Sequence, residues 1–229
     1  MADGLAAAVL CGGLGTRLRE ALPGVPKALA LVGGRPFLER LVEQVEGWGA
    51  GRIVLCTGVG GAAIRERFAG RAGIAFSEER EPLGTAGALA LARPQLQTDP
   101  VVVLNGDSMV PGLDFAAFLA AHRGSGAAGS LAVVPPDERR DTGTLALAPD
   151  GRVTAFAEKS ALPGASYVSA GIYLLAQALL AMIPAGRPVS LEREMMPLWI
   201  GRGMHGYVHA GRLVDIGTPE RWREAEAAL

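Results

Sequence analysis

The stretch Leu5-Ala-Ala-Ala-Val-Leu-Cys-Gly-Gly-Leu-Gly-Thr-Arg-Leu18 joins a short apolar run to a glycine-rich turn. An apolar run of this length suits a strand that is buried on both faces of a parallel sheet. Glycines let a backbone approach an anion closely and point several N–H groups at it. Because open α/β sheets bind their ligands at the carboxyl ends of the strands, the turn is a candidate phosphate-binding loop.

Outward from this stretch, short apolar runs alternate with segments of helical period, which is typical of βαβ units. In the first half we expect strands at 5–10, 53–57, 74–77, 101–105 and 130–134, and helices at 37–48, 62–68, 85–92 and 114–122. In the second half we expect shorter strands at 144–147, 153–157, 168–174 and 204–209, and helices at 175–183, 191–199 and 219–228. Since such crossovers are right-handed and place helices on both faces, the pattern predicts an α/β fold, an open, mostly parallel, doubly wound sheet with a smaller second lobe.

The composition is that of a globular chain. Its 229 residues are enough for one α/β domain, and 49% of them are hydrophobic. The 22 basic and 23 acidic side chains nearly cancel, which argues against nucleic acid or an anionic membrane as a partner. We expect a cytoplasmic protein, because the first residues lack a basic signal-peptide region and no apolar run reaches the roughly 18 residues of a membrane span. The two cysteines, Cys11 and Cys56, end apolar runs and are interpreted as reduced core thiols.

The residues after the glycines indicate which phosphate the loop holds. A Walker loop needs Lys and then Ser or Thr after its last glycine, where this chain has Thr16 and Arg17. The dinucleotide pattern needs a third small residue, where this chain has Leu18. Three cations follow in a short span: Arg17, Arg19 and Lys27. Cleavage of a triphosphate needs several cations to neutralise charge that moves onto the leaving group, so a triphosphate is favoured.

The segment Gly12-Gly-Leu-Gly-Thr-Arg-Leu18 with Pro26-Lys-Ala-Leu29 resembles the signature of the sugar-1-phosphate nucleotidyltransferases, also called nucleotide-sugar pyrophosphorylases. The resemblance continues in chain order through Glu81-Pro-Leu-Gly-Thr-Ala-Gly87, Leu104-Asn-Gly-Asp107, Phe156-Ala-Glu-Lys159, Ser169-Ala-Gly-Ile-Tyr173, Ser190-Leu-Glu192 and Val214-Asp-Ile-Gly-Thr-Pro219. It implies a Rossmann-like, glycosyltransferase-A-like fold with a single domain over 1–229. About 1–135 would form the nucleotide-binding lobe, and about 136–229 the sugar-binding lobe and C-terminal helix.

The resemblance also implies a reaction, in which a sugar 1-phosphate attacks the α-phosphorus of a nucleoside triphosphate and pyrophosphate leaves. No covalent enzyme nucleophile is needed, so the protein acts by positioning and charge. The implied catalytic residues are Arg17, which holds the departing β- and γ-phosphates, Lys27, which contacts the transferred phosphate, and Asp107. The implied nucleotide-binding residues are Leu10, Gly12, Gly13, Gly15, Thr16, Arg17, Glu81, Gly84, Thr85 and Asp107.

By the same resemblance, the residues that bind the sugar phosphate are Gly106, Glu158, Lys159, Ser169, Gly171 and Glu192. Glu158 and Glu192 would contact sugar hydroxyls and Lys159 the phosphate of the sugar. Asp107 and Asp215 each adjoin apolar residues, where an unpartnered carboxylate is costly. A Mg²⁺ ion between them, completed by phosphate oxygens and water, would supply the partner. The alternative is that each aspartate caps a helix or turn.

Within that family, the length, the segment 34–38 and the Ser190-Leu-Glu192 motif most resemble the bacterial heptose-1-phosphate guanylyltransferases, which use GTP and D-glycero-α-D-manno-heptose 1-phosphate to make GDP-heptose for surface polysaccharide or glycosylated metabolites. One expected helix follows Asp215-Ile-Gly-Thr-Pro219, so we expect little beyond the catalytic unit. Mannose-1-phosphate guanylyltransferases, and relatives that use UTP, dTTP, ATP or CTP, share the phosphate motifs and stay open, as does the choice between monomer and homodimer.

Two other classes compete with this interpretation. A nicotinamide-dependent oxidoreductase would carry an acid at the end of its second strand, whereas Glu39 and Glu43 lie inside the first expected helix. An inactive nucleotide-binding regulatory subunit would have no need of Lys159 and Asp215 together with the phosphate-binding cations. The sequence therefore favours an active nucleotidyltransferase.

Overall fold

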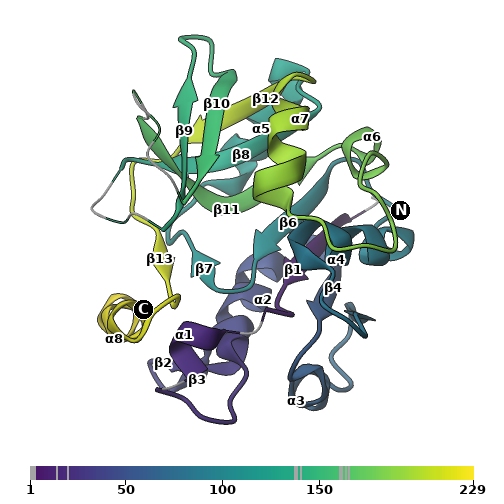
Figure 1. Ribbon diagram of the computed structural model, residues 1–229, viewed down its shortest axis with the longest axis vertical. Helices are drawn as coiled ribbons and strands as arrows, with labels where there is room; N and C mark the ends of the chain where they lie inside the picture. Colours follow the sequence, from purple (N-terminus) through teal and green to yellow (C-terminus); the bar gives the residue numbers. More distant parts are fainter. Residues whose placement is uncertain are drawn as a thin grey trace.

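The computed structural model describes residues 4–13, 15–19, 21–136, 139, 141–159, 162, 164 and 166–229, apart from the side chain of Arg19. Leu14 of the glycine-rich turn and the side chain of Arg19, the third cation of the predicted phosphate site, therefore lie outside the described residues. Within this part of the chain, nine strands form one sheet that runs through the molecule (Figure 1). None of the helices described is long and apolar enough to cross a membrane.

The large sheet contains strands from both halves of the sequence. Its path is β10-β9-β11-β6-β1-β4-β5, and β8 pairs with both β11 and β12. The strands are β1 (Leu5–Leu10), β4 (Ala50–Thr57), β5 (Ile74–Glu78), β6 (Val101–Asn105), β8 (Gly129–Val134), β9 (Gly143–Leu147), β10 (Val153–Glu158), β11 (Tyr167–Leu175) and β12 (Met204–Val208). Two small ribbons stand apart from it, β2 (Leu31–Val32) with β3 (Arg35–Pro36), and β7 (Ser108–Met109) with β13 (Val214–Asp215).

The helical elements connect these strands. The α-helices are α1 (Thr16–Arg19), α2 (Phe37–Gly47), α3 (Gly61–Arg67), α4 (Gly84–Ala92), α5 (Phe115–Ser125), α6 (Gln177–Leu180), α7 (Met196–Ile200) and α8 (Pro219–Ala228). Short 3-10 turns lie at η1 (Lys27–Leu29) and η2 (Arg93–Gln95), and a π-helical turn, η3 (Leu191–Met195), leads into α7.

The parallel, doubly wound part of the prediction is confirmed. Strand β1 lies between β4 and β6 and is parallel to both, and β5 continues the parallel order beside β4. From β11 onward the neighbours β6, β8 and β9 pair antiparallel, so the sheet is mixed. Because β1 sits where the chain reverses its direction of winding, the crevice beyond its carboxyl end is where a ligand is expected.

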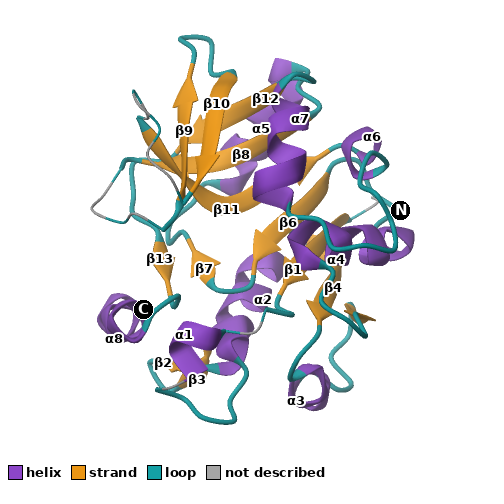
Figure 2. Ribbon diagram, viewed as in Figure 1, coloured by secondary structure: helices purple, strands orange, loops and turns teal. Residues whose placement is uncertain are grey.

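The sheet has a core on each face, which explains the continuous apolar runs. In β1, Ala7 and Val9 pack into one core, while Ala6 and Ala8 pack into the other. Helices α2 and α5 cover the first core, and α4, α6 and α7 cover the second (Figure 2). A strand buried on both faces cannot alternate apolar and polar residues.

Two expected helices of the second half are wrong in extent. The helix expected at 175–183 is only α6, because β11 extends to Leu175 and the chain beyond Leu180 continues in i→i+3 turns. The helix expected at 191–199 begins as the π-helical turn η3 and becomes α-helical only at Met196. Pro197 has no N–H to donate to the preceding turn, which interrupts the regular pattern there.

Candidate active site

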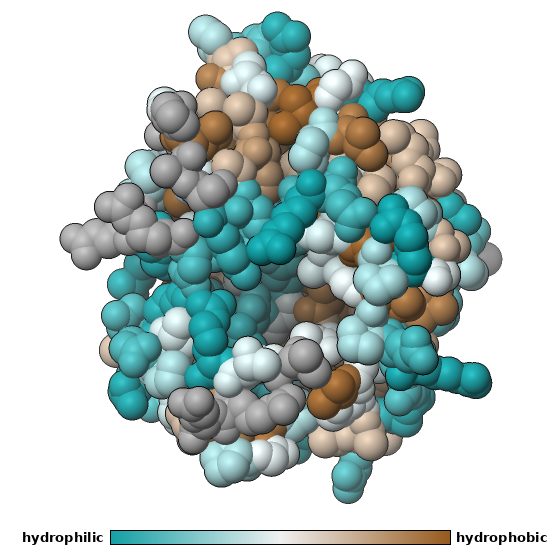
Figure 3. Space-filling model, viewed as in Figure 1, coloured by the Kyte–Doolittle hydropathy of each residue, from teal (hydrophilic) through white to brown (hydrophobic). Residues whose placement is uncertain are grey.

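A cavity of about 1230 Å³ opens beyond the carboxyl ends of β1, β4 and β6. Residues of both halves of the chain line it, and Figure 3 shows hydrophilic side chains around the hollowed face of the molecule. Every residue that the sequence analysis assigned to nucleotide, sugar phosphate, metal or catalysis lies in this wall: Leu10, Gly12, Gly13, Gly15, Thr16, Arg17, Lys27, Glu81, Gly84, Thr85, Gly106, Asp107, Glu158, Lys159, Ser169, Gly171, Glu192 and Asp215. The fold thus brings these residues to one site, while their individual roles stay predictions.

The glycine-rich turn needs its glycines for close packing. A Cβ atom on Gly12 would lie 3.0 Å from the backbone N of Gly58. Gly15 has a φ of +56°, and a Cβ there would lie 2.8 Å from the Cβ of Lys27. The turn can therefore run close to both β4 and η1 only because side chains are missing at these two positions.

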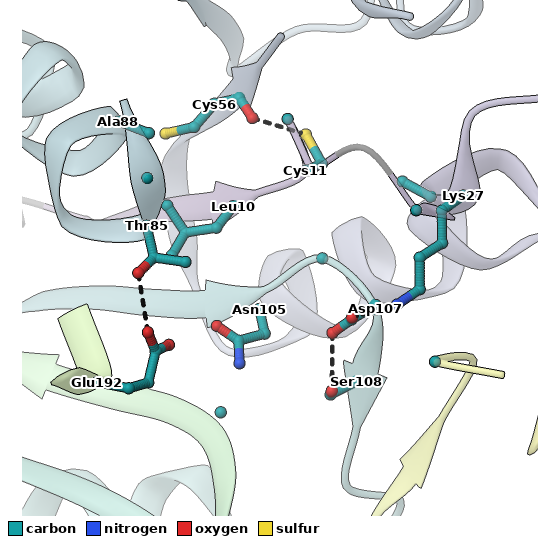
Figure 4. A pocket seen from close by; sticks show the side chains of 18 of the residues that line it. Leu10, Cys11, Lys27, Cys56, Thr85, Ala88, Asn105, Asp107, Ser108 and Glu192 are labelled. Carbon is teal, nitrogen blue, oxygen red and sulfur yellow. Dashed lines mark hydrogen bonds and ion pairs between the residues drawn. The ribbon is translucent and has the colours of Figure 1, made fainter. Parts of the chain in front are cut away.

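The thiols of Cys11 and Cys56 belong to the floor of the cavity (Figure 4). The Sγ of Cys11 donates to the carbonyl O of Cys56 at 3.2 Å, and both cysteines are free and buried. Burial raises the pKa of the Cys56 thiol to about 12 and raises that of Cys11 well above its ordinary value. Both are therefore neutral packing groups and not nucleophiles at neutral pH.

Lys27 and Asp107 form an ion pair at the centre of the cavity (Figure 4). The Nζ of Lys27 lies 2.5 Å from Oδ2 of Asp107, and only 16% of the lysine side chain is exposed. Ser108 donates its hydroxyl to the other carboxylate oxygen at 2.9 Å. Burial opposes the charge of Asp107, but Lys27 and Ser108 together hold the pKa of this carboxyl below its usual value. A cation and an anion are therefore both present where a phosphate would react.

Asp215 reaches the same place from the far end of the sequence. Strand β13 pairs antiparallel with β7, with Asp215 opposite Ser108, and the N–H of Ile216 donates to the carbonyl O of Asp107 at 3.0 Å. Asp215 accepts from Arg139 at 2.7 Å and from Arg221 at 3.1 Å. Its Oδ1 also accepts from the N–H of Gly217 at 2.8 Å. Asp215 thus forms a turn contact of the kind given as the alternative to a metal site, and it is also part of an ion-pair cluster.

The donor set of these two aspartates suits a hard divalent cation. Asp107 directly precedes Ser108, the residue that pairs with Asp215 between β7 and β13. In phosphate-transfer sites, Mg²⁺ takes one or two carboxylates and completes its shell with phosphate oxygens and water. Among the described residues, no group of three or more Asp, Glu, His or Cys side chains forms a cage that could hold a metal by itself. The two aspartates therefore fit an ion that binds together with a phosphate ligand. Asp107 would then contact both the ion and Lys27, and Asp215 would contact the ion, Arg139 and Arg221.

Gly84 and Thr85, which the resemblance assigns to the nucleotide and its base, also join the two halves of the chain. Thr85 donates its hydroxyl to Glu192 at 2.9 Å and accepts from the N–H of Leu191 at 2.8 Å (Figure 4). The first N–H groups of α4 donate to the carbonyl O of Val189. Gly84 has a φ of +70°, and a Cβ there would lie 2.6 Å from that same oxygen. The start of α4 is therefore fixed by the segment before η3.

Replacing Gly84 by Ala should lower the free energy of unfolding by about 2–4 kcal/mol, since the left-handed conformation and the close carbonyl both resist a side chain. Gly112→Ala is the matched control, because Gly112 has a φ of +72° but nothing within 4 Å of its added Cβ. Urea unfolding of the two variants separates the conformational cost from the contact with Val189. Equal losses in both variants would show that the contact with Val189 is unimportant.

The wall formed by the second half is acidic. Burial raises the pKa of Glu158, and the charge of Glu192 raises it further. Tyr173 and Ser169 share a hydrogen bond of 3.3 Å between their hydroxyl groups.

Lys159 has a φ of +53°, and among the described residues it is the one non-glycine with a positive φ. Such strain at a cavity wall points to a side chain placed for function.

The structure adds three charged residues that the sequence analysis missed: Arg139, Asp141 and Arg221. Asp141 and Arg221 line the cavity, and Asp141 pairs with both Arg17 and Arg221. Their sequence neighbourhoods are ordinary, since Arg221 lies in a helix with exposed charged side chains and Arg139 and Asp141 lie between two strands. No local pattern marks them, because their partners are up to 124 positions away in the sequence.

Three comparisons with known proteins agree with this geometry. The family model described as nucleotidyl transferase matches residues 6–229. A mannose-1-phosphate guanylyltransferase of Mycobacterium tuberculosis is 34% identical over 97% of this chain and 64% of its own length. A D-glycero-α-D-manno-heptose 1-phosphate guanylyltransferase of Aneurinibacillus thermoaerophilus is 30% identical over 97% of both chains. The chain thus spans less than two thirds of the mannose-1-phosphate relative and nearly all of the heptose relative.

The fold has close counterparts among solved structures. HddC from Yersinia pseudotuberculosis complexed with GMP-PN superposes with a TM-score of 0.84, at 28% identity, over 98% of this chain and 99% of that one. The agreement extends over both halves of the chain and so includes every element that lines the cavity.

Proposed function

The chain belongs to the nucleotidyl transferase family, and we propose that it transfers GMP from GTP to D-glycero-α-D-manno-heptose 1-phosphate, with release of pyrophosphate. The observation that carries the proposal is the single cavity, which runs from the glycine-rich turn past the Lys27–Asp107 pair to Glu158 and Glu192. One end offers backbone and cations to a triphosphate, and the other offers carboxylates to hydroxyl groups. The heptose relative, matched over 97% of both chains, supports the choice of sugar and base.

In this reaction a phosphate oxygen of the sugar 1-phosphate forms a bond to the α-phosphorus of GTP. The bond from that phosphorus to the oxygen bridging to the β-phosphate breaks, and its electrons leave with pyrophosphate. Both reactants are anions, so the protein must hold them together and neutralise the crowded phosphates. Lys27 would stabilise the transferred phosphate, while Arg17 would hold the departing β- and γ-phosphates. No proton transfer is required, because the attacking oxygen is already ionised.

Asp107 and Asp215 would hold Mg²⁺, which would supply positive charge to neutralise phosphate oxygens. For this chain's own residues, the consequence is a change of partners. Lys27, whose Nζ now lies 2.5 Å from Oδ2 of Asp107, would give up part of this contact and turn toward the phosphate.

The acidic wall would select the sugar. Glu158 and Glu192 can accept hydrogen bonds from sugar hydroxyls, and the raised pKa of Glu158 reflects its burial first and then the nearby carboxylate of Glu192. A heptose and a mannose 1-phosphate differ little in the groups they present, and a pocket of this kind separates such analogues by modest factors. Mannose 1-phosphate is therefore the second candidate acceptor, and the mannose-1-phosphate guanylyltransferase relative favours it.

The free, buried thiols of Cys11 and Cys56 suit a reducing compartment such as the cytoplasm.

Pyrophosphate release by the purified chain tests the proposal. GTP, ATP, UTP, CTP and dTTP are each combined with heptose, mannose, glucose and N-acetylglucosamine 1-phosphates in the presence of Mg²⁺. We expect the fastest release with GTP and the heptose phosphate, slower release with GTP and mannose 1-phosphate, and none after Mg²⁺ is removed by a chelator. Faster release with another combination of nucleotide and sugar phosphate would support the reaction class but exclude GTP and the heptose phosphate as the preferred substrates. Silence across the grid with intact GTP binding would indicate a nucleotide-binding subunit without transferase activity.

A further inference from the structure

Two arginines from opposite ends of the sequence converge on a single oxygen atom. Arg17, on α1, and Arg221, on α8, both donate to Oδ2 of Asp141, and the distance from Nη2 of Arg221 is 2.6 Å. All three side chains line the cavity beside the predicted phosphate site. Two guanidinium groups that meet on one anionic oxygen form the arrangement that proteins use to bind a phosphate.

Arg221 would keep its position without Asp141. Its second terminal nitrogen, Nη1, donates to Asp215 at 3.1 Å, and Thr218 caps the first turn of α8 by accepting from the N–H of Arg221. Only 14% of the Arg221 side chain is exposed. An anion that displaced Asp141 would thus meet a guanidinium already held in place, with little conformational entropy left to lose.

Asp141 neutralises the two arginines when no phosphate is present. Burial opposes its ionisation, but the hydrogen bonds from Arg17 and Arg221 hold its pKa at about 2, so it is an anion at neutral pH. Half of the Arg17 side chain is exposed and a third of Asp141, which leaves the Arg17–Asp141 contact open to solvent and to exchange. A phosphate group that approached these arginines would also be repelled by the Asp141 carboxylate.

We propose that Arg221 is a second arginine for the β- and γ-phosphates of the nucleotide, and that Asp141 occupies their place in the free protein and gives up both arginines when the triphosphate binds. The assignment rests on the proposed function for the identity of the ligand. Asp141 then acts as an internal competitor for the triphosphate. Its removal should strengthen binding, which is opposite to the effect expected for a structural or metal-binding carboxylate.

The test uses inorganic tripolyphosphate as the probe, because it carries the phosphates without base or ribose. Its binding to the full chain is measured by calorimetry at fixed Mg²⁺ and pH. Asp141→Asn should lower the dissociation constant about three- to tenfold, as expected for removal of a competing ion pair. Asp150→Asn is the matched control, since Asp150 pairs with Arg152 outside this cavity and carries the same charge. It should leave the dissociation constant unchanged, as should either variant for GMP, which lacks the β- and γ-phosphates.

Arg221 is tested by Arg221→Met and Arg221→Lys, each checked by thermal unfolding. Both should weaken tripolyphosphate binding about three- to tenfold, because methionine has no charge and lysine lacks the planar guanidinium that donates to two partners at once. In the double variant Asp141→Asn/Arg221→Met, the gain from Asp141→Asn should shrink. Unchanged or weaker binding by Asp141→Asn overturns the inference, as does a full gain that persists in the double variant.

The failure of this inference is distinguishable from failure of the proposed function. If the substrate grid is silent while Asp141→Asn binds tripolyphosphate more tightly, the arginine pair is a phosphate site in a protein with another role. If guanylyl transfer is found and Asp141→Asn has no effect on binding, the reaction stands and Asp141 is only a surface partner of the arginines.

Discussion

Replacement of Lys27 by Met should lower kcat for pyrophosphate release by about 10²- to 10³-fold, the usual effect of removing one fixed donor from a developing negative charge. The Nζ of Lys27 lies 2.5 Å from Oδ2 of Asp107, and its side chain is mostly buried. Asp107 keeps its bond from Ser108, and we therefore expect a loss of only about 1 kcal/mol in the free energy of unfolding.

Steady-state kinetics at saturating substrates, together with urea unfolding, measures both quantities. Arg152→Met is the control, because it removes a cation from the exposed pair with Asp150. A Lys27→Met variant with the rate of the parent protein would exclude Lys27 from the transition state. A variant that lost stability and activity together would show that Lys27 serves mainly to neutralise Asp107.

Asp107→Asn should reduce turnover by about 10³-fold or more, because the change removes the charge that pairs with Lys27 and that is proposed to hold the metal ion. Asparagine keeps the shape of the side chain and can still accept from Ser108, so the fold should survive. The rate measured against Mg²⁺ concentration distinguishes the causes. If Asp107 is a metal ligand, the variant should need a higher Mg²⁺ concentration for its half-maximal rate, and high Mg²⁺ should partly restore turnover.

The control for this variant is Asp150→Asn, which removes an exposed carboxylate far from the predicted metal position. If Asp107→Asn lost its rate with an unchanged Mg²⁺ dependence, Asp107 would act only by orienting Lys27. If it retained the parent rate, Asp107 would have no part in catalysis.

The sequence predicted correctly those helices and strands whose own residues carry a clear pattern. Val101–Asn105 is a continuous apolar run and forms β6, and the residue run from Phe37 has a clear helical period and forms α2. The two-residue strands β7 and β13 have no periodicity to read, because each exists only as the partner of the other. The prediction of a helix at 175–183 failed for a local reason, since β11 takes its first residue and the chain after Leu180 forms i→i+3 turns.

The same distinction holds for the residues of the candidate site. The glycine-rich turn, Lys27 and Asp107 were identified because short motifs carry them, and all lie in one cavity. Asp141 and Arg221 were not, because their importance depends on contacts with each other and with Arg17 across the fold. Nor does the sequence reveal that Thr85 joins Glu192, which ties the expected base pocket to the acidic wall.

The pairing of β7 with β13 has a consequence for the order in which the protein folds. Ser108 and Asp215 are neighbours in space but lie 107 positions apart along the chain. Such a contact closes a very long loop, and contacts of this kind are made late and slowly. During synthesis the parallel strands of the first half can assemble while Asp215 is still inside the ribosome. The nascent chain would therefore hold the parallel strands of the first half before Asp215 pairs with Ser108.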